Sequence, residues 1–471
     1  MKTLNCFSPA AVCAILWPLL LTGCGRPAAP PTTASTESPP PLRAVSPDPR
    51  ALALAPHDGD DPVDRDIHRF QGQVRNSSNR RAALERLGWA FVAKARGSFD
   101  TGFYKLAEAC ADVLDSDSPG GPEALLLRGH VFQNLHRFQE AESLARELVA
   151  RRGLSFDFGL LGDTLMERGR IQEAVAAYQS MVDTRPDLQS YARIAHVRWL
   201  TGDLDGAIQM MQAAVNASSP ADADSAAWVN HRLAALEVQA GNPEAARRNC
   251  AAALELRPDY APALLLRGKM LLAQNDAAAA IADLERAAQR NPLPEYQWAL
   301  SEALRAARRE PEARQVETRL RSRGATSDPR TFALYLATRG EEPSLAVQLA
   351  ESELQQREDV FTHDALAWAL AAAGRIEEAG TQMTLALAEG TGDARLLFHA
   401  AVIAARAGRT EDATQWFTKV AVMMDLLLPS EQELLLRLPD GFARRDAETK
   451  ADLPPSAATD LSAPALAAEG K

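Results

Sequence analysis

Histidine and cysteine, the side chains that most often bind metals or act as nucleophiles, are few and widely spaced in this chain of 471 residues. There are eight histidines and five cysteines, and the chain contains no G-x-S-x-G, H-E-x-x-H, C-x-x-C, G-x-G-x-x-G or P-loop pattern. His130, His196 and His231 come closest to a group, but none follows another by the four residues that place two imidazoles on one helix face. The sequence therefore predicts no metal site, no cofactor and no enzymatic activity.

Tryptophan and arginine supply the other chemistry of the chain, because large aromatic and guanidinium side chains dominate the binding energy of protein interfaces. The chain has seven tryptophans. Such residues bind a partner together only where the fold presents them on one surface. Their role therefore depends on the elements that position them.

Ten alanines recur along the chain at intervals of 33 or 34 residues, with one interval of 39: Ala107, Ala141, Ala174, Ala207, Ala246, Ala280, Ala313, Ala346, Ala379 and Ala413. Five residues before each alanine lies a predicted turn position, occupied by Gly102, His136, Gly169, Gly202, Gly241, Asn275, Arg308, Glu341, Gly374 and Gly408. This period is typical of stacked helical hairpins. A small residue where the two helices of a hairpin cross lets their backbones approach closely.

The repeat resembles the tetratricopeptide repeat, most clearly around Ala174. That family has a small residue, a turn glycine, an aromatic residue and a proline after the second helix, and the matching residues are Gly162, Gly169, Tyr178 and Pro186. The copies at Ala313 and Ala346 match least, because neither has the turn glycine or the closing proline. The resemblance implies an all-α fold, a right-handed α-solenoid of about ten helical hairpins over residues 67–428.

The resemblance also implies a binding surface, because the first helix of each tetratricopeptide hairpin lines a concave groove that takes up peptides or partner helices. Placed on that frame, the groove residues are His130, Asn134, His196, Trp199, Trp228, His231, Trp298, Arg305, Tyr335, Arg339, Trp368, Phe398 and Arg406. We hypothesise that Trp199, Trp228 and Trp298 form a central anchor strip. The alternative for each tryptophan is packing against the neighbouring hairpin.

The first 24 residues resemble a bacterial lipoprotein signal. Lys2 is followed by an apolar stretch over residues 7–21 and by Leu-Thr-Gly-Cys, which ends at Cys24. The resemblance implies that signal peptide 1–23 is removed and that Cys24 is acylated, which would anchor the chain to a membrane. Gly25, where an aspartate retains enterobacterial lipoproteins in the inner membrane, favours the outer membrane facing the periplasm. The alternative is an uncleaved anchor helix, which two prolines within the apolar stretch disfavour.

Segments of low complexity flank the predicted repeats. Residues 24–66 are rich in Pro, Ala, Ser, Thr and Asp and have almost no aromatic residues, which predicts a disordered tether. Residues 447–471 are rich in Ala, Pro and Ser and are predicted to be a disordered tail. Between the repeats and this tail, Ser430 and Glu433 have the spacing of a capping box, which predicts a capping helix over residues 429–446.

The two cysteines within the predicted repeats, Cys110 and Cys250, lie four repeats apart. Each repeat of a solenoid contacts mainly its neighbours, so a disulfide between them is geometrically disfavoured. Both are predicted to be small buried thiols.

The net charge of −11 disfavours a nucleic-acid partner, because nucleic acids are bound through positive fields. The repeats account for nearly all of the chain between its flanking segments, so no room is left for a catalytic domain. The sequence indicates a lipid-anchored scaffold or adaptor of the bacterial cell envelope that binds a protein or peptide partner. By resemblance, such lipoproteins serve pilus assembly, outer-membrane protein assembly or polysaccharide export. The alternative is an accessory of polysaccharide-export or secretion machinery whose aromatic side chains contact carbohydrate.

Overall fold

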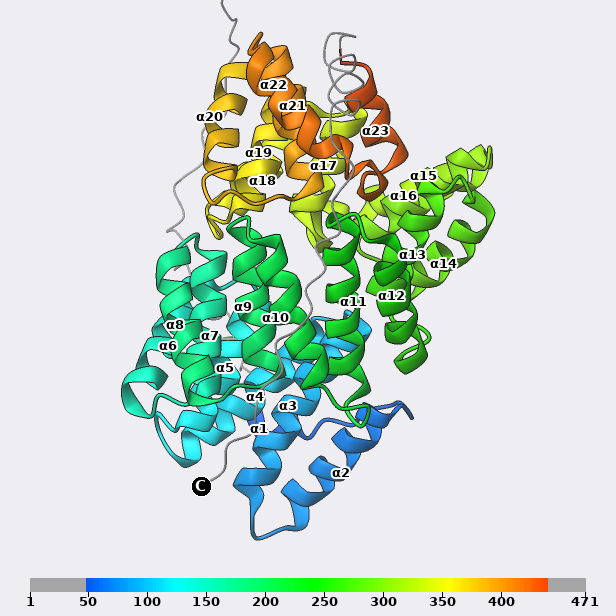
Figure 1. The fold of residues 1–471 in the computed structure, drawn as a ribbon. Helices are drawn as coiled ribbons and strands as arrows, with labels where there is room; N and C mark the ends of the chain where they lie inside the picture. Colours follow the sequence, from blue (N-terminus) through cyan, green and yellow to red (C-terminus); the bar gives the residue numbers. More distant parts are fainter. Residues whose placement is uncertain (1–47, 439–471) are drawn as a thin grey trace, which may run out of the picture. The chain divides into compact units, whose positions relative to one another are not determined.

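The computed structural model describes residues 48–438, and these residues form α-helices, one short 3-10 helix and no strand. From α3 onward the helices of this part of the chain pair in sequence order into ten hairpins (Figure 1). We refer to the first helix of each hairpin as its A helix and the second as its B helix. The hairpins are α3 (Arg80–Ser98) with α4 (Gly102–Asp117), α5 (Pro122–Asn134) with α6 (Phe138–Arg151), α7 (Ser155–Glu167) with α8 (Ile171–Thr184), α9 (Leu188–Leu200) with α10 (Leu204–Asn216), α11 (Ala223–Gln239) with α12 (Pro243–Leu256), α13 (Ala261–Ala273) with α14 (Ala277–Arg290), α15 (Pro294–Ala306) with α16 (Glu310–Ser327), α17 (Pro329–Arg339) with α18 (Pro343–Leu354), α19 (Val360–Ala372) with α20 (Ile376–Ala386), and α21 (Ala394–Arg406) with α22 (Thr410–Ala421). The predicted all-α solenoid of about ten hairpins is confirmed.

The repeated alanines are the tightest points of the hairpins. All ten are fully buried, and each lies in the first half of a B helix. The A helices carry matching small residues: a Cβ atom added to Gly162 of α7 would overlap the Tyr178 ring, and one added to Gly268 of α13 would overlap Leu284. Small residues on both helices thus set how closely each pair packs.

The turns within the hairpins contain residues in the left-handed conformation, which reverses the chain in a few residues. Eight of the ten predicted turn positions have a positive φ, and three of these are not glycine: His136 (58°), Asn275 (62°) and Arg308 (60°). The other two predictions are wrong. Gly102 already belongs to α4, because α3 runs on to Ser98 and Phe99 makes the turn, and Glu341 lies between Gly340 and Glu342, which take the positive φ instead.

The packed chain starts earlier than its composition predicts. Residues 48–66, assigned to the tether, contain α1 (Pro49–Ala53) and the start of α2 (Pro62–Asn76). The Gln71 amide donates to the carbonyl oxygens of Ala53 and Ala55 at 3.2 and 2.9 Å, so directed hydrogen bonds hold a segment with few large apolar side chains. The predicted signal peptide 1–23, Cys24 and the rest of the tether lie outside the described residues. None of the helices that are described is long and apolar enough to span a membrane.

The last described helix, α23 (Pro429–Leu436), starts one residue before the predicted cap. Glu431 accepts a hydrogen bond from the Leu428 amide at 2.8 Å, whereas Glu433 pairs with Arg437. The predicted Ser430 cap is wrong because Pro429 already has the φ of a first helical residue. The predicted continuation of this helix to residue 446 and the tail 447–471 lie beyond residue 438, where the description ends.

Buried thiols are confirmed within the repeats. Cys110 and Cys250 are both free and buried. The Cys250 thiol donates to the carbonyl oxygen of Ala263 at 3.3 Å. Burial raises the pKa of the Cys250 thiol to about 11, so this thiol stays protonated and unreactive at neutral pH.

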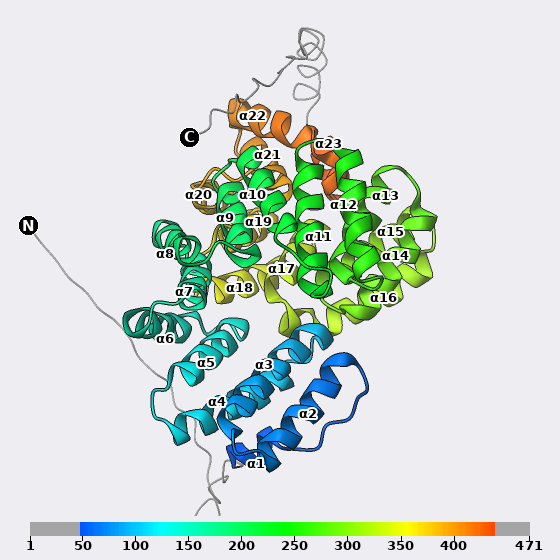
Figure 2. The same ribbon diagram turned by 60° about the horizontal axis from the view of Figure 1, so that its bottom comes forward.

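Hairpins far apart in the sequence also touch, which the repeat pattern did not predict. The turn after α7 meets the segment before α19, where the Glu358 amide donates to the carbonyl oxygen of Glu167 at 3.1 Å. One hairpin further along, the rings of Trp199 and Phe361 stack with centroids 5.8 Å apart. A Cβ atom added to Gly202 would lie 2.8 Å from the carbonyl oxygen of Gly390. We refer to these contacts together as the closure contact, and Figure 2 shows the ribbons of α7, α9 and α19 between which they form.

The closure contact predicts that equivalent turn glycines differ in importance. Gly169 and Gly241 occupy the same turn position with φ of 67° and 72°, so alanine at either costs about 1–2 kcal/mol of backbone strain. A Cβ atom at Gly169 would also overlap the carbonyl oxygen of Glu358, whereas one at Gly241 meets nothing. We expect Gly169→Ala to lower the free energy of unfolding in urea by at least about 1 kcal/mol more than Gly241→Ala. Equal losses would show that the closure contact adds no stability.

Candidate partner-binding groove

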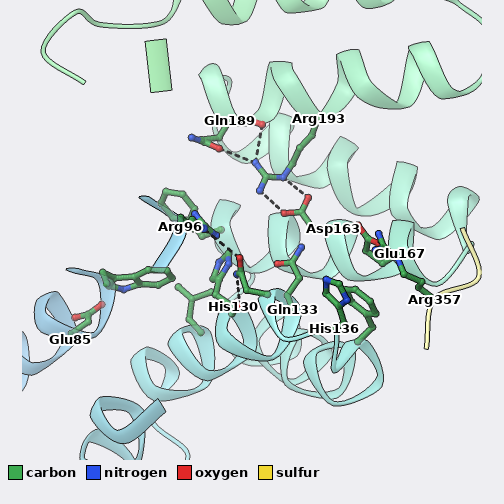
Figure 3. Close-up of a pocket in the computed structure, with 15 residues that line it drawn as sticks. Glu85, Arg96, His130, Gln133, His136, Asp163, Glu167, Gln189, Arg193 and Arg357 are labelled. Carbon is green, nitrogen blue, oxygen red and sulfur yellow. Dashed lines mark hydrogen bonds and ion pairs between the residues drawn. The ribbon is translucent and has the colours of Figure 1, made fainter. Parts of the chain in front are cut away.

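The A helices of the first four hairpins surround a cavity of about 660 Å³ (Figure 3). Successive A helices contribute to its wall because each hairpin repeats the geometry of the one before it. The lining residues are Glu85, Trp89 and Arg96 from α3, Leu126, His130, Gln133 and Asn134 from α5, His136 from the turn after α5, Phe138 from the start of α6, Phe156, Asp163 and Glu167 from α7, Gln189 and Arg193 from α9, and Arg357 before α19. A cavity of this size holds several side chains of a bound segment.

His130 and Asn134, two of the predicted groove residues, lie one turn apart on α5 and line this cavity. The Trp89 and His130 rings meet edge to face with centroids 5.0 Å apart. The Asn134 amide donates to the His130 carbonyl oxygen at 2.7 Å, and its oxygen accepts from the Tyr104 hydroxyl at 2.9 Å. Within the described residues, Nδ1 of His130 has no hydrogen-bond partner. One hydrogen-bonding atom of the imidazole is therefore enclosed without a partner.

Asp163 and Arg193 form a rigid charged wall of the cavity (Figure 3). The Arg193 guanidinium donates to both carboxylate oxygens of Asp163, at 2.7 and 2.6 Å, and the Tyr178 hydroxyl donates to the same carboxylate at 2.9 Å. Burial alone would raise the pKa of Asp163, but the adjacent guanidinium outweighs it and the pKa is lowered. Asp163 is therefore ionised at neutral pH and satisfied within the chain.

The closure contact supplies the end of the cavity. Arg357 pairs with Glu167 of α7, and its Nε donates to Asp359 at 3.0 Å. Burial raises the pKa of Glu167 despite the neighbouring Arg357, whereas Arg330 and Arg357 overcome the effect of burial on Asp359 and lower its pKa. An ion-pair network between hairpins far apart in the sequence thus borders the cavity.

The other predicted groove residues of the N-terminal half are spread over different environments. His196 packs beside Trp199, with centroids 5.4 Å apart, and the Trp199 indole donates to Gln239 at 2.6 Å. His231 meets the edge of the Tyr260 ring at 6.0 Å. Trp199, Trp228 and Trp298 are 8%, 36% and 0% exposed, so they do not form one accessible strip as predicted.

Four predicted groove residues of the C-terminal half are instead core residues, and the packing alternative holds for them: Trp298, Tyr335, Trp368 and Phe398. The Trp298 ring lies edge-on to Tyr335 at 5.7 Å, and the Arg395 guanidinium covers its face at 5.1 Å. The Trp368 ring stacks on His399 at 4.3 Å. These four residues lie at the predicted positions of the A helices. Other side chains pack against them, so a partner has no access to their rings.

The three predicted groove arginines make contacts within the chain. Arg305 binds Glu317 of α16 at 2.8 Å, Arg339 lies 3.6 Å from Glu341, and the Arg406 guanidinium lies 5.8 Å from the Trp368 ring centroid. None of them lines the cavity. Among residues 48–438, no three His, Cys, Asp or Glu side chains are grouped as a metal site requires.

The cavity includes residues that the sequence analysis did not select. Arg96 lies eleven residues before Ala107, the same offset that separates His130 from Ala141 and Asp163 from Ala174, so the repeat itself could have identified it. Phe156 and Arg357 have no such signal. Phe156 lies at the start of α7 with 49% of its surface exposed, and Arg357 reaches the cavity only through the closure contact.

The A helices of the C-terminal half are covered by the chain itself. The 3-10 helix η1 (Met424–Leu426) contacts α13 and α21, and α23 contacts α15, α17 and α21. We refer to residues 423–438 as the C-terminal segment. The predicted capping helix is therefore laid across the A helices of earlier hairpins and is not simply stacked beyond α22.

The tetratricopeptide repeat family matches residues 160–224, 231–293 and 271–329. Among solved structures, a thermophilic TPR protein of Thermus thermophilus is 20% identical, with a TM-score of 0.33 over 38% of this chain and 92% of that one. MamA from Desulfovibrio magneticus RS-1 is 16% identical, with a TM-score of 0.28 over 37% of this chain and 96% of that one. The C-terminal part of a TPR repeat-containing protein from Cytophaga hutchinsonii is 18% identical, with a TM-score of 0.30 over 59% of this chain and 99% of that one. The comparison with curated proteins found no match.

Three half-buried histidines of the A helices predict a stability that depends on pH. Burial, with a smaller contribution from Arg96, lowers the pKa of His130 to about 3, and burial lowers those of His196 and His231 to about 4 and about 3. Between these values and the unfolded pKa of about 6.5, the unfolded chain binds more protons than the folded one. The contribution of these groups is therefore complete above about pH 6.5 and is lost as the pH falls.

We expect the free energy of unfolding in urea to be lower at pH 5 than at pH 7, and the decrease to be smaller in His130→Gln. The variant keeps a polar side chain at the cavity but has no group that titrates in this range. An equal decrease in the variant and the wild type would contradict the assignment to His130.

Proposed function

We propose that this chain, which matches the tetratricopeptide repeat family over residues 160–224, 231–293 and 271–329, is a lipid-anchored adaptor of the bacterial cell envelope that binds a segment of a protein partner in its cavity. Tetratricopeptide repeats form scaffolds for protein interactions and are typically not enzymes. One observation carries the proposal: the A helices of four successive hairpins line an open cavity, whereas the C-terminal segment covers the same face of later hairpins. The open part of the A-helix face is the place for a partner.

The chemistry of the cavity suits an extended peptide with charged side chains. Glu85 and Arg96 make no ion pair within the described residues, and both lie on α3 at the cavity. Eleven residues of helix separate them by about 16 Å, which an extended chain spans in about five residues. We infer that the bound segment places a basic residue near Glu85 and an acidic residue near Arg96, with apolar side chains against Trp89 and Phe156.

Peptide selection tests this site without requiring the natural partner. Peptides from a random phage-displayed library would be selected on the purified chain, and their affinity measured for Trp89→Ala, Phe156→Ala and Trp416→Ala. We expect each of the first two variants to weaken binding at least about tenfold, because tenfold is about 1.4 kcal/mol and truncation of a central aromatic anchor costs about 2 kcal/mol or more. Trp416 lies on B helix α22 outside the cavity and is the matched control.

Unfolding midpoints of the three variants would show that each remains folded. Selected peptides that bind Trp89→Ala and Phe156→Ala as tightly as the wild type would place the binding surface elsewhere.

Membrane attachment rests on the resemblance of residues 1–24 to a lipoprotein signal. We infer that Cys24 carries acyl chains and that the repeats act from the outer membrane, facing the periplasm. More than one acyl chain makes such an anchor effectively permanent, because each buried CH₂ contributes about 0.8 kcal/mol.

A serine at residue 24 tests the anchor directly. We expect Cys24→Ser to move the chain from the membrane fraction to the soluble fraction and to abolish labelling by an alkyne-tagged fatty acid, because serine offers no thiol for acylation. Cys13→Ser, a change within the predicted signal peptide, is the matched control and should leave both properties intact. A Cys24→Ser chain that still floats with membranes would refute acylation at this residue.

The alternative, carbohydrate contact in polysaccharide-export or secretion machinery, loses much of its basis. It depended on aromatic groove residues, and a sugar cannot stack on the buried rings of Trp298 and Trp368. We therefore favour a protein partner.

A further inference from the structure

The C-terminal segment lies on the A-helix face that binds partners in a helical-repeat scaffold. Its two helices, η1 and α23, contact four A helices, α13, α15, α17 and α21, that belong to hairpins six, seven, eight and ten (Figure 1). The segment thus crosses several repeats, as a bound peptide would, in a groove separate from the cavity on α3 to α9.

One face of α23 enters this groove and the other faces solvent. Leu428 and Leu435 are fully buried, and so is Glu431 between them. Glu431 and Leu435 are four positions apart in α23 and therefore lie on one side of the helix, and Leu428 is its N-cap residue. Leu436 is exposed, and the ion pair between Arg437 and Glu433 is also exposed. One side of α23 thus packs on the A helices while the other side is exposed, as in a helix docked on a helix-binding surface.

The groove also recognises the segment through polar contacts. Glu302 of α15 accepts a hydrogen bond from the amide of Ser430 at 3.1 Å, in the first turn of α23, where a carboxylate is favourable. The Arg395 guanidinium of α21 donates to Glu431 at 2.6 Å. Arg395 also forms an ion pair with Glu295 of α15, and Lys269 of α13 contacts Glu295 at 2.7 Å. Alternating charges on three A helices thus hold the Arg395 side chain in place.

The link between the repeats and the segment is accessible. Val422, directly after α22, is 67% exposed and follows the last helix of the hairpins. The segment therefore enters the groove from an exposed connection, and its removal would leave Arg395 facing an empty site.

We propose that the A-helix face of α13, α15, α17 and α21 is a helix-binding groove that the C-terminal segment occupies as an intramolecular competitor. The partner that displaces it is a short amphipathic helix with two leucines seven residues apart, an acidic residue three positions after the first, and free amides in its first turn. Arg395 binds the acidic residue and Glu302 binds the helix start. The groove is thus a second docking site, closed in the free protein.

Cleavage of the full chain tests the proposal. A protease site would be inserted after Val422, and a fluorescent peptide of residues 423–438 would be titrated before and after cutting. We expect no binding to the uncut chain, because the covalently linked segment competes at high effective concentration. The cut chain should bind the peptide, with the released fragment exchanging out of the groove.

Peptide variants test the specificity of the groove without changing the scaffold. We expect Glu431→Gln in the peptide to weaken binding at least about tenfold, because it removes the ion pair with Arg395. Glu433→Gln is the matched control, since Glu433 pairs only with Arg437 on the exposed side, and it should bind as the parent peptide does.

Three outcomes would overturn the proposal. The fragment could stay bound through gel filtration and never exchange with peptide, or the cut chain could lose its helical circular dichroism; either result would make the segment a permanent part of the core. Equal affinity of the Glu431→Gln and Glu433→Gln peptides would show that the ion pair with Arg395 does not contribute to the specificity of the groove.

Discussion

The close approach of two helices at one small side chain is the constraint on which the rest of the structure depends. At each hairpin a fully buried alanine lies in the B helix, and at Gly162 and Gly268 even one added carbon would collide with the facing side chain. Because the spacing of the pair is set this way ten times, the A helices follow one another in equivalent positions. A continuous A-helix face results from a local rule.

That face is divided into two parts with different surfaces. Along α3 to α9 it surrounds a cavity with polar, charged and aromatic groups, some of which have no partner within the described residues. Along α13 to α21 the C-terminal segment covers it, and Arg395 connects Glu295 of the groove to Glu431 of the segment. The closure contact joins hairpins of the two parts through Glu167 and Arg357. A uniform scaffold thus carries one open and one occupied surface.

The repeats could be predicted from the sequence because their causes are local. A small residue at the crossing and a left-handed residue at the turn are properties of single positions, and even His136 and Arg308 lie at the turns predicted for them. His130 and Asn134 were placed in the groove by the same register, which would also have found Arg96. The position of a residue within the repeat predicts which face of the A helix it lies on. It does not predict which side chains from distant parts of the chain cover that face.

The turn at Gly102 and the Ser430 cap were mispredicted for local reasons, whereas the larger failures come from contacts between residues far apart in the chain. Trp298 is on the predicted helix face, but Arg395, almost a hundred residues later, covers its ring. Arg357 reaches the cavity because a segment 190 residues beyond Glu167 folds back to it. The order of residues 48–66 depends on Gln71, whose side chain reaches back to their carbonyl oxygens. A repeat pattern holds no information on such pairs.

The closure contact has a consequence for how this chain evolves. Open solenoids lengthen or shorten by duplicating or deleting whole units, since every unit needs only its neighbours. Here Gly202 faces Gly390 and Glu167 faces Glu358, so gaining or losing one unit between them would shift both pairs out of register together. A change in the number of units within that stretch would therefore break both contacts at once, whereas a unit added outside it would leave them in place.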